Sequence, residues 1–435
     1  MSARDTALNA LIACRKEGAW SNGILKEYCT RDRLDTRDAA LASRLCYGVL
    51  QNRIKLDFYL KQLLTGKMKD LHPVVHDILL LGLYQIYEMD KIPPSAAVNE
   101  SVLLAKKYCG KMRNAAGLVN GILRNAVRTR GTLCEPRSYV DRYSHPQKLV
   151  DLLIDYVGKS EIEKMLAANN MVAPTVAQVN TFRISADALV ERLETDGVCV
   201  KKHAWLDNCL ILSDTGSIEQ LSAFQEGLFY VQDAAAKLSV LCARIPEDAA
   251  VLDCCAAPGG KSFAAAIEGA GSVVSCDIHA HKVTLIQNGA QRLGLSSVTA
   301  MQQDASVFCP QWERKMDVVI ADVPCSGYGI IRKKPDIRYK DPDTMVDLPE
   351  IQLSILNNQA SYVKPGGVLL YSTCTLVRAE NEGVVEAFLK DNPDFYTEPL
   401  ELPAIFPNNS SGMLALIPGK YDTDGFFICR MRRKL

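Results

Sequence analysis

The residues of this chain best suited to chemistry lie in short segments of its carboxyl-terminal half. The stretch VVIADVPCSG, residues 318–327, runs from strand-like residues into an acid, a proline and a cysteine. This cysteine, Cys325, has three interpretations: a buried apolar filler, a metal ligand or a reacting thiol. The sequence contains no CxxC pair, and its histidines are not spaced from cysteines as ligands would be, which argues against a structural zinc site.

A second segment, LDCCAAPGGKS at residues 252–262, follows a predicted strand and opens a predicted helix. Gly259 and Gly260 would let the backbone approach a ligand close to the free N–H groups of the helix start. The segment matches neither GxGxxG nor GxxxxGK[ST], which disfavours a dinucleotide or phosphate loop. From the glycines alone, an ordinary tight turn between strand and helix is the alternative.

Three aspartates lie at the ends of successive predicted strands: Asp277, Asp304 and Asp322. The carboxyl ends of parallel strands meet at one edge of a sheet, where open α/β folds bind their ligands. Each acid alone is typical of a turn or a helix cap. The three together indicate a ligand site.

The segments that carry these residues alternate between strand and helix, which indicates a parallel sheet with crossover helices. Strands are predicted at residues 249–256, 271–278, 297–305, 316–323 and 366–374, and a strand-turn-strand hairpin at 412–433. A mostly parallel sheet closed by an antiparallel hairpin is a Rossmann-like fold.

The first part of the chain has a different pattern, because it reads as helices throughout. Residues 72–90 are apolar on nearly all sides, as expected of a buried central helix, and Pro93 and Pro94 cannot continue it. The chain is therefore predicted to be multidomain. The expected parts are an all-α domain at 1–130, a helical connector at 131–170, a small α/β domain at 171–243 and the Rossmann-like domain at 244–435.

Charge is unevenly distributed along the chain, although its formal net charge is zero. Residues 1–145 contain 23 Lys and Arg against 14 Asp and Glu, and the remainder 27 against 36. The basic first part suggests a surface for a polyanion, with a merely solvated cationic surface as the alternative.

No apolar stretch reaches the ~20 residues of a membrane span. The start of the chain lacks a signal peptide's apolar block, and the cysteines in apolar runs indicate reduced thiols, so we expect a cytoplasmic protein.

Three longer motifs carry a resemblance to a known family. The segments CCAAPGGKS, DVPCSGYGIIRKKPDIRY and YSTCTLVRAENE resemble, in content and order, those of the S-adenosylmethionine-dependent RNA cytosine-5 methyltransferases of the Sun/NOL/NOP2 kind. IPPSAAVNESVLLAKK and LVNGILRNAVR resemble the NusB-like RNA-binding domain. The resemblance covers nearly the whole chain.

The resemblance implies a covalent mechanism. A cysteine thiolate adds to C6 of cytosine, and C5 becomes nucleophilic enough to take the methyl group. By resemblance, Cys374 is the nucleophile, Cys325 the thiol that assists release, and Asp322 the partner of the cytosine N3 edge. Lys261 is expected beside Asp322 at the reacting centre, with a simple loop cap as the alternative.

The resemblance also implies binding roles. Asp277 would bind the ribose hydroxyls of S-adenosylmethionine and Asp304 the adenine edge. The full expected cofactor set is Cys254, Cys255, Ala256, Ala257, Pro258, Gly259, Gly260, Lys261, Asp277, Asp304 and Asp322. RNA phosphate is expected at Arg332, Lys333, Lys334 and Arg338, with a charged surface loop as the alternative. Val323 departs from the family, which usually has alanine there, and is expected to affect packing more than chemistry.

By resemblance, the expected substrate is cytosine 967 of 16S rRNA, methylated before the subunit is fully assembled. The base must leave its stack to reach a thiol, so a flipped or single-stranded cytosine is expected. We expect a monomer without a metal. The alternatives are the same chemistry on tRNA or 23S rRNA, and a non-catalytic assembly factor. The NusB-like extension argues against the first, and the set of Asp322, Cys325 and Cys374 against the second.

Overall fold

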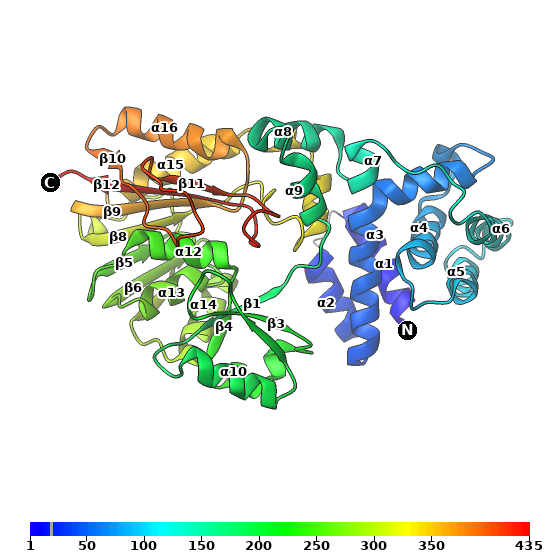
Figure 1. Cartoon of the computed structure of the whole chain (residues 1–435), viewed down its shortest axis with the longest axis horizontal. Helices are drawn as coiled ribbons and strands as arrows, with labels where there is room; N and C mark the ends of the chain where they lie inside the picture. The colour runs from blue at the N-terminus through cyan, green and yellow to red at the C-terminus, as the bar shows by residue number, and fades with distance from the viewer. Residues whose placement is uncertain (18–20) are drawn as a thin grey trace. The chain divides into compact units, whose positions relative to one another are not determined.

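The computed structural model describes residues 1–17 and 21–435, and the chain divides into two compact units (Figure 1). The first contains Met1–Ile154 together with Ile331–Asp341, and the second contains Asp155–Ile330 together with Pro342–Leu435. Residues 331–341 therefore pack with the helices of the first unit, although the sequence pattern grouped them with the Rossmann-like domain. Within the described ranges, no helix combines the length and apolar character needed to cross a bilayer.

The first unit is helical, as predicted. Its main helices are α1 (Ala3–Glu17), α2 (Ser21–Arg31), α3 (Thr36–Leu63), α4 (Pro73–Glu88), α5 (Pro94–Tyr108) and α6 (Ala115–Arg128). Three short helices lie in the range predicted as a helical connector: α7 (Tyr139–Tyr143), α8 (Gln147–Val157) and α9 (Ile162–Ala168), the last of which belongs to the second unit.

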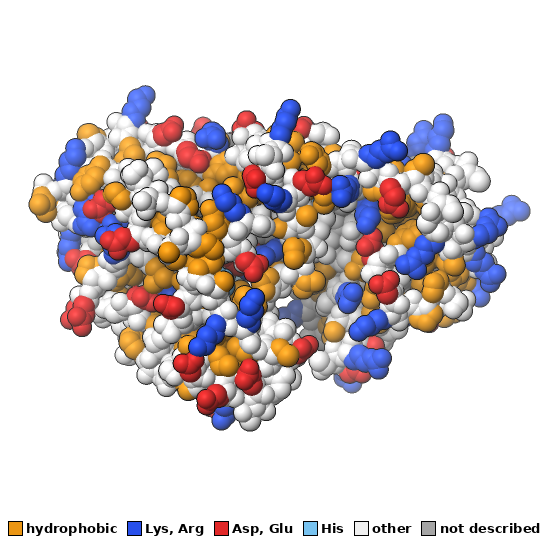
Figure 2. All heavy atoms as spheres, viewed as in Figure 1, with side chains coloured by type: hydrophobic (Ala, Val, Ile, Leu, Met, Phe, Trp, Pro, Cys, Tyr) orange, Lys and Arg blue, Asp and Glu red, His pale blue; other side chains and the backbone are white. Residues whose placement is uncertain are grey.

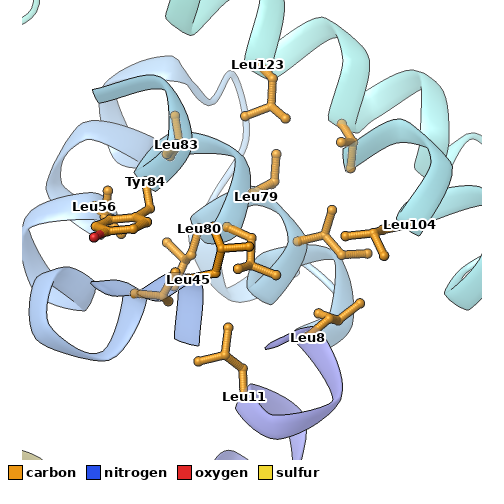
Figure 3. Packing of buried hydrophobic residues seen from close by; sticks show 14 of the residues in the cluster. Leu8, Leu11, Leu45, Leu56, Leu79, Leu80, Leu83, Tyr84, Leu104 and Leu123 are labelled. Atoms are coloured by element: carbon orange, nitrogen blue, oxygen red, sulfur yellow. The ribbon is translucent and has the colours of Figure 1, made fainter. Parts of the chain in front are cut away.

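Helix α4 is the centre of this unit, which confirms the prediction from its all-round apolar sequence. Its residues Ile78, Leu79, Leu80, Leu81 and Leu83 are all buried. Leucines of α1, α3, α5 and α6 converge on α4 (Figure 3). This burial of apolar surface stabilises the helical unit.

After α9, the second unit forms a small antiparallel sheet in the order β2-β3-β1-β4. Its elements are β1 (Thr175–Val179), α10 (Ala186–Thr195), β2 (Cys199–Lys202), β3 (Cys209–Ser213), α11 (Ser222–Gln225) and β4 (Phe229–Val231). The sequence of this region predicts a strand at 175–183, a helix at 184–198 and strands at 209–214 and 227–233, which β1, α10, β3 and β4 match. Strand β2 was not predicted because its four residues are short and end in two exposed lysines.

The larger sheet has eight strands in the order β10-β12-β9-β8-β5-β6-β7, with β11 paired to β12. The strands are β5 (Ala250–Asp253), β6 (Ser272–Asp277), β7 (Val298–Gln302), β8 (Met316–Asp322), β9 (Val363–Thr373), β10 (Phe395–Thr397), β11 (Met413–Leu416) and β12 (Phe426–Arg433). Strands β5 to β9 are parallel, and β12 runs antiparallel to β9. The Rossmann-like fold with its closing hairpin is confirmed.

Helices cover both faces of this sheet (Figure 1). They are α12 (Ala234–Ala243), α13 (Gly260–Ile267) and α14 (Ala280–Leu293) on one face, and α15 (Leu348–Ala360) and α16 (Glu382–Asp391) on the other. Successive residues of β8 alternate between the two layers: Val318 and Ile320 join the first core, and Val319 and Ala321 the second. Because both faces are buried, the central strands read as continuous apolar runs.

Candidate active site

The candidate active site lies where the strand order reverses. Strand β5 pairs with β6 on one side and with β8 on the other, so the connections leave in opposite directions and open a crevice at the carboxyl ends. Strand β8 ends at Asp322, and β9 ends at Thr373. The segments that follow them carry Cys325 and Cys374.

The structure brings the two cysteines together. Their Sγ atoms are 3.2 Å apart, although the residues are far apart in sequence. Both side chains are partly exposed. The hydrogen bond to the Cys374 sulfur, together with burial and nearby carboxylates, raises the pKa of the Cys325 thiol well above its ordinary value. The raised pKa favours the protonated thiol at Cys325, and the short distance brings both sulfurs within reach of one bound group.

Asp322 lies beside the thiols in a fixed orientation. Its Oδ2 is 2.5 Å from the Lys261 Nζ, and its Oδ1 accepts the Ser372 hydroxyl at 2.7 Å. Lys261 is 9% exposed and also lies over the Phe426 ring. The lysine is thus a buried ion-pair partner of Asp322, and its charge holds the carboxylate in place at the reacting centre.

A pocket of about 500 Å³ opens at the same edge of the sheet, and this volume suits a ligand of cofactor size. Six residues of the expected cofactor set line it: Cys254, Cys255, Ala257, Asp277, Asp304 and Asp322. The other five, Ala256, Pro258, Gly259, Gly260 and Lys261, do not line it. Gly259 and Gly260 instead form the turn into α13, in which Gly259 has a φ of +111° that favours glycine.

Two carboxylates in the pocket can accept hydrogen bonds from a ligand. Asp277 is 6% exposed, and its Oδ1 accepts the backbone N–H of His279 at 3.0 Å. The Ser306 hydroxyl and backbone N–H both donate to Asp304, which lowers the pKa of that carboxyl. Two carboxylates can accept from ribose hydroxyls and from an exocyclic amine.

Apolar side chains complete the pocket, although no sequence pattern placed them there. Ile278, Ile351 and Ile355 line it together with Val323 and Pro324. Ile278 could have been found because it directly follows Asp277 at the end of a strand. Ile351 and Ile355 gave no signal, because they belong to α15 and reach the pocket only through the tertiary fold.

Beneath the glycine turn lies a buried polar chain that was also not predicted. The Ser275 hydroxyl donates to the Ser262 Oγ at 2.7 Å, and the Ser262 hydroxyl donates to the Asp253 Oδ2 at 2.7 Å. Asp253 is fully buried, and burial raises the pKa of its carboxyl to about 7. The chain ties the ends of β5 and β6 to α13.

The four residues expected at RNA phosphate have different environments. Arg338 is 0% exposed, and its guanidinium donates to the carbonyls of Gln51 and Ser144 at 2.8 and 3.2 Å. It therefore cannot contact phosphate at the surface, and the expectation for Arg338 is corrected. Arg332 is also buried, at 8% exposed, while Lys333 and Lys334 are half-buried.

An exposed cationic surface lies instead on the helical unit (Figure 2). Its members come from α5, α6 and the turn between them: Lys106, Lys107, Lys111, Arg113, Arg124 and Arg128, all exposed.

Among the residues that the structure describes, no three His, Cys, Asp or Glu side chains are grouped to hold a metal ion.

Comparisons with protein families cover the chain almost from end to end. A family model described as "NusB family" matches residues 1–128, and a "Methyltr_RsmF/B-like, ferredoxin-like domain" matches residues 145–219. The model described as "16S rRNA methyltransferase RsmB/F" matches residues 240–432.

Individual relatives match over their full length. A probable ribosomal RNA small subunit methyltransferase B of Bacillus subtilis (strain 168) is 38% identical, covering 100% of this chain and 99% of the relative. A protein with this name from Klebsiella pneumoniae (strain 342) is 31% identical over 99% and 98% of the two chains.

Solved structures share the fold. The structure named PH0851 has a TM-score of 0.81 at 23% identity and covers 98% of both chains. A methyltransferase homolog protein from Pyrococcus horikoshii has a TM-score of 0.59 at 26% identity, covering 68% of this chain and 98% of its own. On the family match and the full-length relatives together, the chain belongs to the RsmB/F family of 16S rRNA methyltransferases.

Proposed function

We propose that this protein methylates C5 of a cytosine in 16S rRNA, at cytosine 967, through a covalent adduct between Cys374 and C6. The observation that carries the proposal is the thiol pair, with Cys325 and Cys374 Sγ atoms 3.2 Å apart, beside the Lys261–Asp322 ion pair. The rRNA substrate is supported by the names of the relatives and by the helical domain that matches the NusB family.

The proposed cofactor is S-adenosylmethionine, which supplies an electrophilic methyl group at a sulfonium. Asp277 and Asp304 would accept hydrogen bonds from its ribose and adenine, and Ile278 and Ile351 would contact the faces of the adenine. Asp322 also lines the pocket, so the methyl donor and the base would meet at its carboxylate.

The chain's own residues account for the remaining steps. The Cys374 thiolate adds to C6, and the electron pair of the C5–C6 double bond moves into the ring toward N3 and C5. N3 gains electron density in the adduct and takes up a proton from solvent, which the Asp322 carboxyl group, fixed by Lys261 and Ser372, would relay and take back when the thiolate leaves. After methyl transfer the C5 proton must leave so that the thiolate can depart. We assign assistance in that elimination to Cys325, and the distance of 3.2 Å between its Sγ and the Cys374 Sγ supports this role.

The experiment is methyl transfer from radiolabelled S-adenosylmethionine to unmodified 16S rRNA, followed by mapping of the labelled nucleotide. We expect one labelled cytosine, at position 967. Label in tRNA or 23S rRNA would contradict the substrate, and label on a base other than cytosine would contradict the chemistry.

Variants of the two cysteines test the mechanism. Cys374→Ala is expected to abolish methyl transfer, and Cys325→Ala to accumulate a covalent protein–RNA adduct that survives denaturing electrophoresis. Cys134→Ala, at an exposed cysteine of the helical unit, is the matched control and should behave as the wild type. Full methyl transfer by Cys374→Ala would show that the nucleophile is assigned wrongly.

A further inference from the structure

Two consecutive buried residues hold the loops that carry the two cysteines. Glu380 ends the short 3-10 helix Arg378–Glu380, and Asn381 precedes α16. Glu380 is 3% exposed and Asn381 is 0% exposed. The proposed mechanism gives neither residue a chemical role, so their polar contacts require another explanation.

Glu380 holds the loop of Cys325. Its Oε2 accepts the Ser326 backbone N–H at 2.9 Å, and its Oε1 accepts the Ser326 hydroxyl at 2.5 Å. The Gln352 amide donates to Glu380 Oε2 and to the Pro324 carbonyl, each at 2.9 Å. The residues on both sides of Cys325 are therefore fixed, and every group that faces the Glu380 carboxylate in these bonds is a donor.

Asn381 holds the loop of Cys374 in the same manner. Its Oδ1 accepts the Thr373 hydroxyl at 2.6 Å, and its Nδ2 donates to the Thr375 carbonyl at 3.1 Å. These contacts again lie on both sides of the cysteine. A hydrogen bond of 2.7 Å between the Ser326 and Thr375 hydroxyls joins the two loops directly.

We propose that Glu380 and Asn381 are positioning residues that set the distance between the Cys325 and Cys374 sulfurs. Neither touches a reacting atom. Glu380 fixes one thiol, Asn381 fixes the other, and because they are neighbours in the chain, the two loops share one anchor. This inference rests on the proposed function for its catalytic meaning, and on the hydrogen-bond geometry for its structural part.

The shared anchor matters because both thiols must reach one base. A misplacement of about 1 Å in a reacting group can cost about 100-fold in rate. Loss of the Glu380 contacts should displace Cys325 and so impair release of the product. Loss of the Asn381 contacts should displace Cys374 and so impair formation of the adduct.

Two nearly isosteric variants test this difference. Glu380→Gln places an amide donor against the donors of Ser326 and Gln352, and Asn381→Asp places a carboxylate oxygen against the Thr375 carbonyl. We expect kcat to fall by about 100-fold in both, with KM for S-adenosylmethionine unchanged. The covalent RNA adduct should accumulate in Glu380→Gln and should not form in Asn381→Asp. Glu386→Gln, an exposed residue of α16, is the matched control and should match the wild type.

A second readout does not depend on methyl transfer. Diamide oxidises two neighbouring thiols to a disulfide: the sulfurs lose two protons and two electrons, and the diamide becomes the corresponding hydrazine. The yield of the Cys325–Cys374 disulfide over time, measured by mass spectrometry, reports how often the sulfurs meet. We expect its formation to slow at least tenfold in both variants.

The outcomes separate this inference from the proposed function. Disulfide formation at the wild-type rate in both variants would overturn the inference, whatever the activity. Slowed disulfide formation would support it, even if the wild type transferred no methyl group to RNA. If either variant fails to fold, Ser326→Ala removes one donor to Glu380 and the bridge to Thr375, and the same two readouts apply.

Discussion

At the residue scale, Lys261 forms a buried ion pair with Asp322. Its ammonium is buried against the Asp322 carboxylate, so removing it would leave that carboxylate without its cation. Breaking such a pair costs more than the pair itself contributes, because one charge remains in a poorly solvated site.

We therefore predict that Lys261→Met lowers the rate of methyl transfer by at least about 100-fold and also lowers the melting temperature. The matched control is Lys364→Met. Lys364 pairs with Asp317 at 2.9 Å, but its side chain is 41% exposed, so the effect on stability should be below about 1 kcal/mol. Equal losses in both variants would contradict the proposed role of Lys261.

Asp253 makes the stability of the fold depend on pH. The pKa of its buried carboxyl is raised from an ordinary 3.8 to about 7. Because the folded state holds the proton more tightly than the unfolded state, this stabilisation is full below about pH 3.8 and is lost as the pH rises to about 7.

The comparison of wild type with Asp253→Asn isolates this contribution. Asparagine cannot ionise but still accepts the Ser262 hydroxyl through its side-chain oxygen. We predict that the melting temperature of the wild type falls relative to the variant between pH 5 and pH 8, measured by calorimetry. Parallel curves over that range would show that Asp253 does not titrate as its burial implies.

At the scale of elements, packing of α3 against α4 depends on a glycine. A Cβ at Gly48 would lie 1.9 Å from the Tyr84 Cζ, and the Tyr84 ring is itself buried. Gly121 on α6 is also helical, but a Cβ there meets nothing within 4 Å.

Substitution at the two glycines should thus have opposite effects. Gly48→Ala is predicted to destabilise the helical unit by about 1–3 kcal/mol through overpacking. Gly121→Ala should stabilise it by about 0.5–1 kcal/mol, because alanine has the higher helix propensity. Urea denaturation followed by circular dichroism measures both, and a loss of stability in Gly121→Ala would contradict this account.

Helices and strands whose apolar residues recur at a regular spacing could be predicted from the sequence. The residues at the ends of those elements could be predicted with them. The strand-end acids and the glycine turn could be placed because parallel strands share one edge. Ile351 and Ile355 could not, because nothing in the sequence relates α15 to the pocket. Strands β2 and β10 are too short to show a period. The burial of Arg338 also could not be predicted. A basic segment is expected at the surface, and nothing in the sequence relates Arg338 to the carbonyls of Gln51 and Ser144.

At the scale of the whole molecule, the segment Ile331–Asp341 joins the helical unit from within the second unit's sequence. Its 3-10 helix, Pro335–Tyr339, is held by the buried Arg338 and by the Tyr339 hydroxyl, which donates to the Leu50 carbonyl at 2.6 Å. The Ser21 hydroxyl also donates to Asp336, at 2.5 Å.

We predict that Arg338→Met destabilises the helical unit by about 1–3 kcal/mol, because the carbonyls of Gln51 and Ser144 lose a buried donor. Hydrogen exchange of the α3 amides should increase in this variant. Lys340→Met, at an exposed position on the same segment, is the control and should leave exchange unchanged. If Arg338→Met instead weakened RNA binding without any change in exchange, a role in RNA contact would be restored to Arg338.

The placement of this segment has a consequence for how the protein can be divided. The chain passes between its two units three times, after Ile154, Ile330 and Asp341, so no single cut separates them. Deleting residues 1–154 would uncover Ile337 and Arg338, both buried in the whole chain. The helical domain therefore cannot be transplanted or removed as one continuous piece, and a graft or truncation must carry residues 331–341 with it.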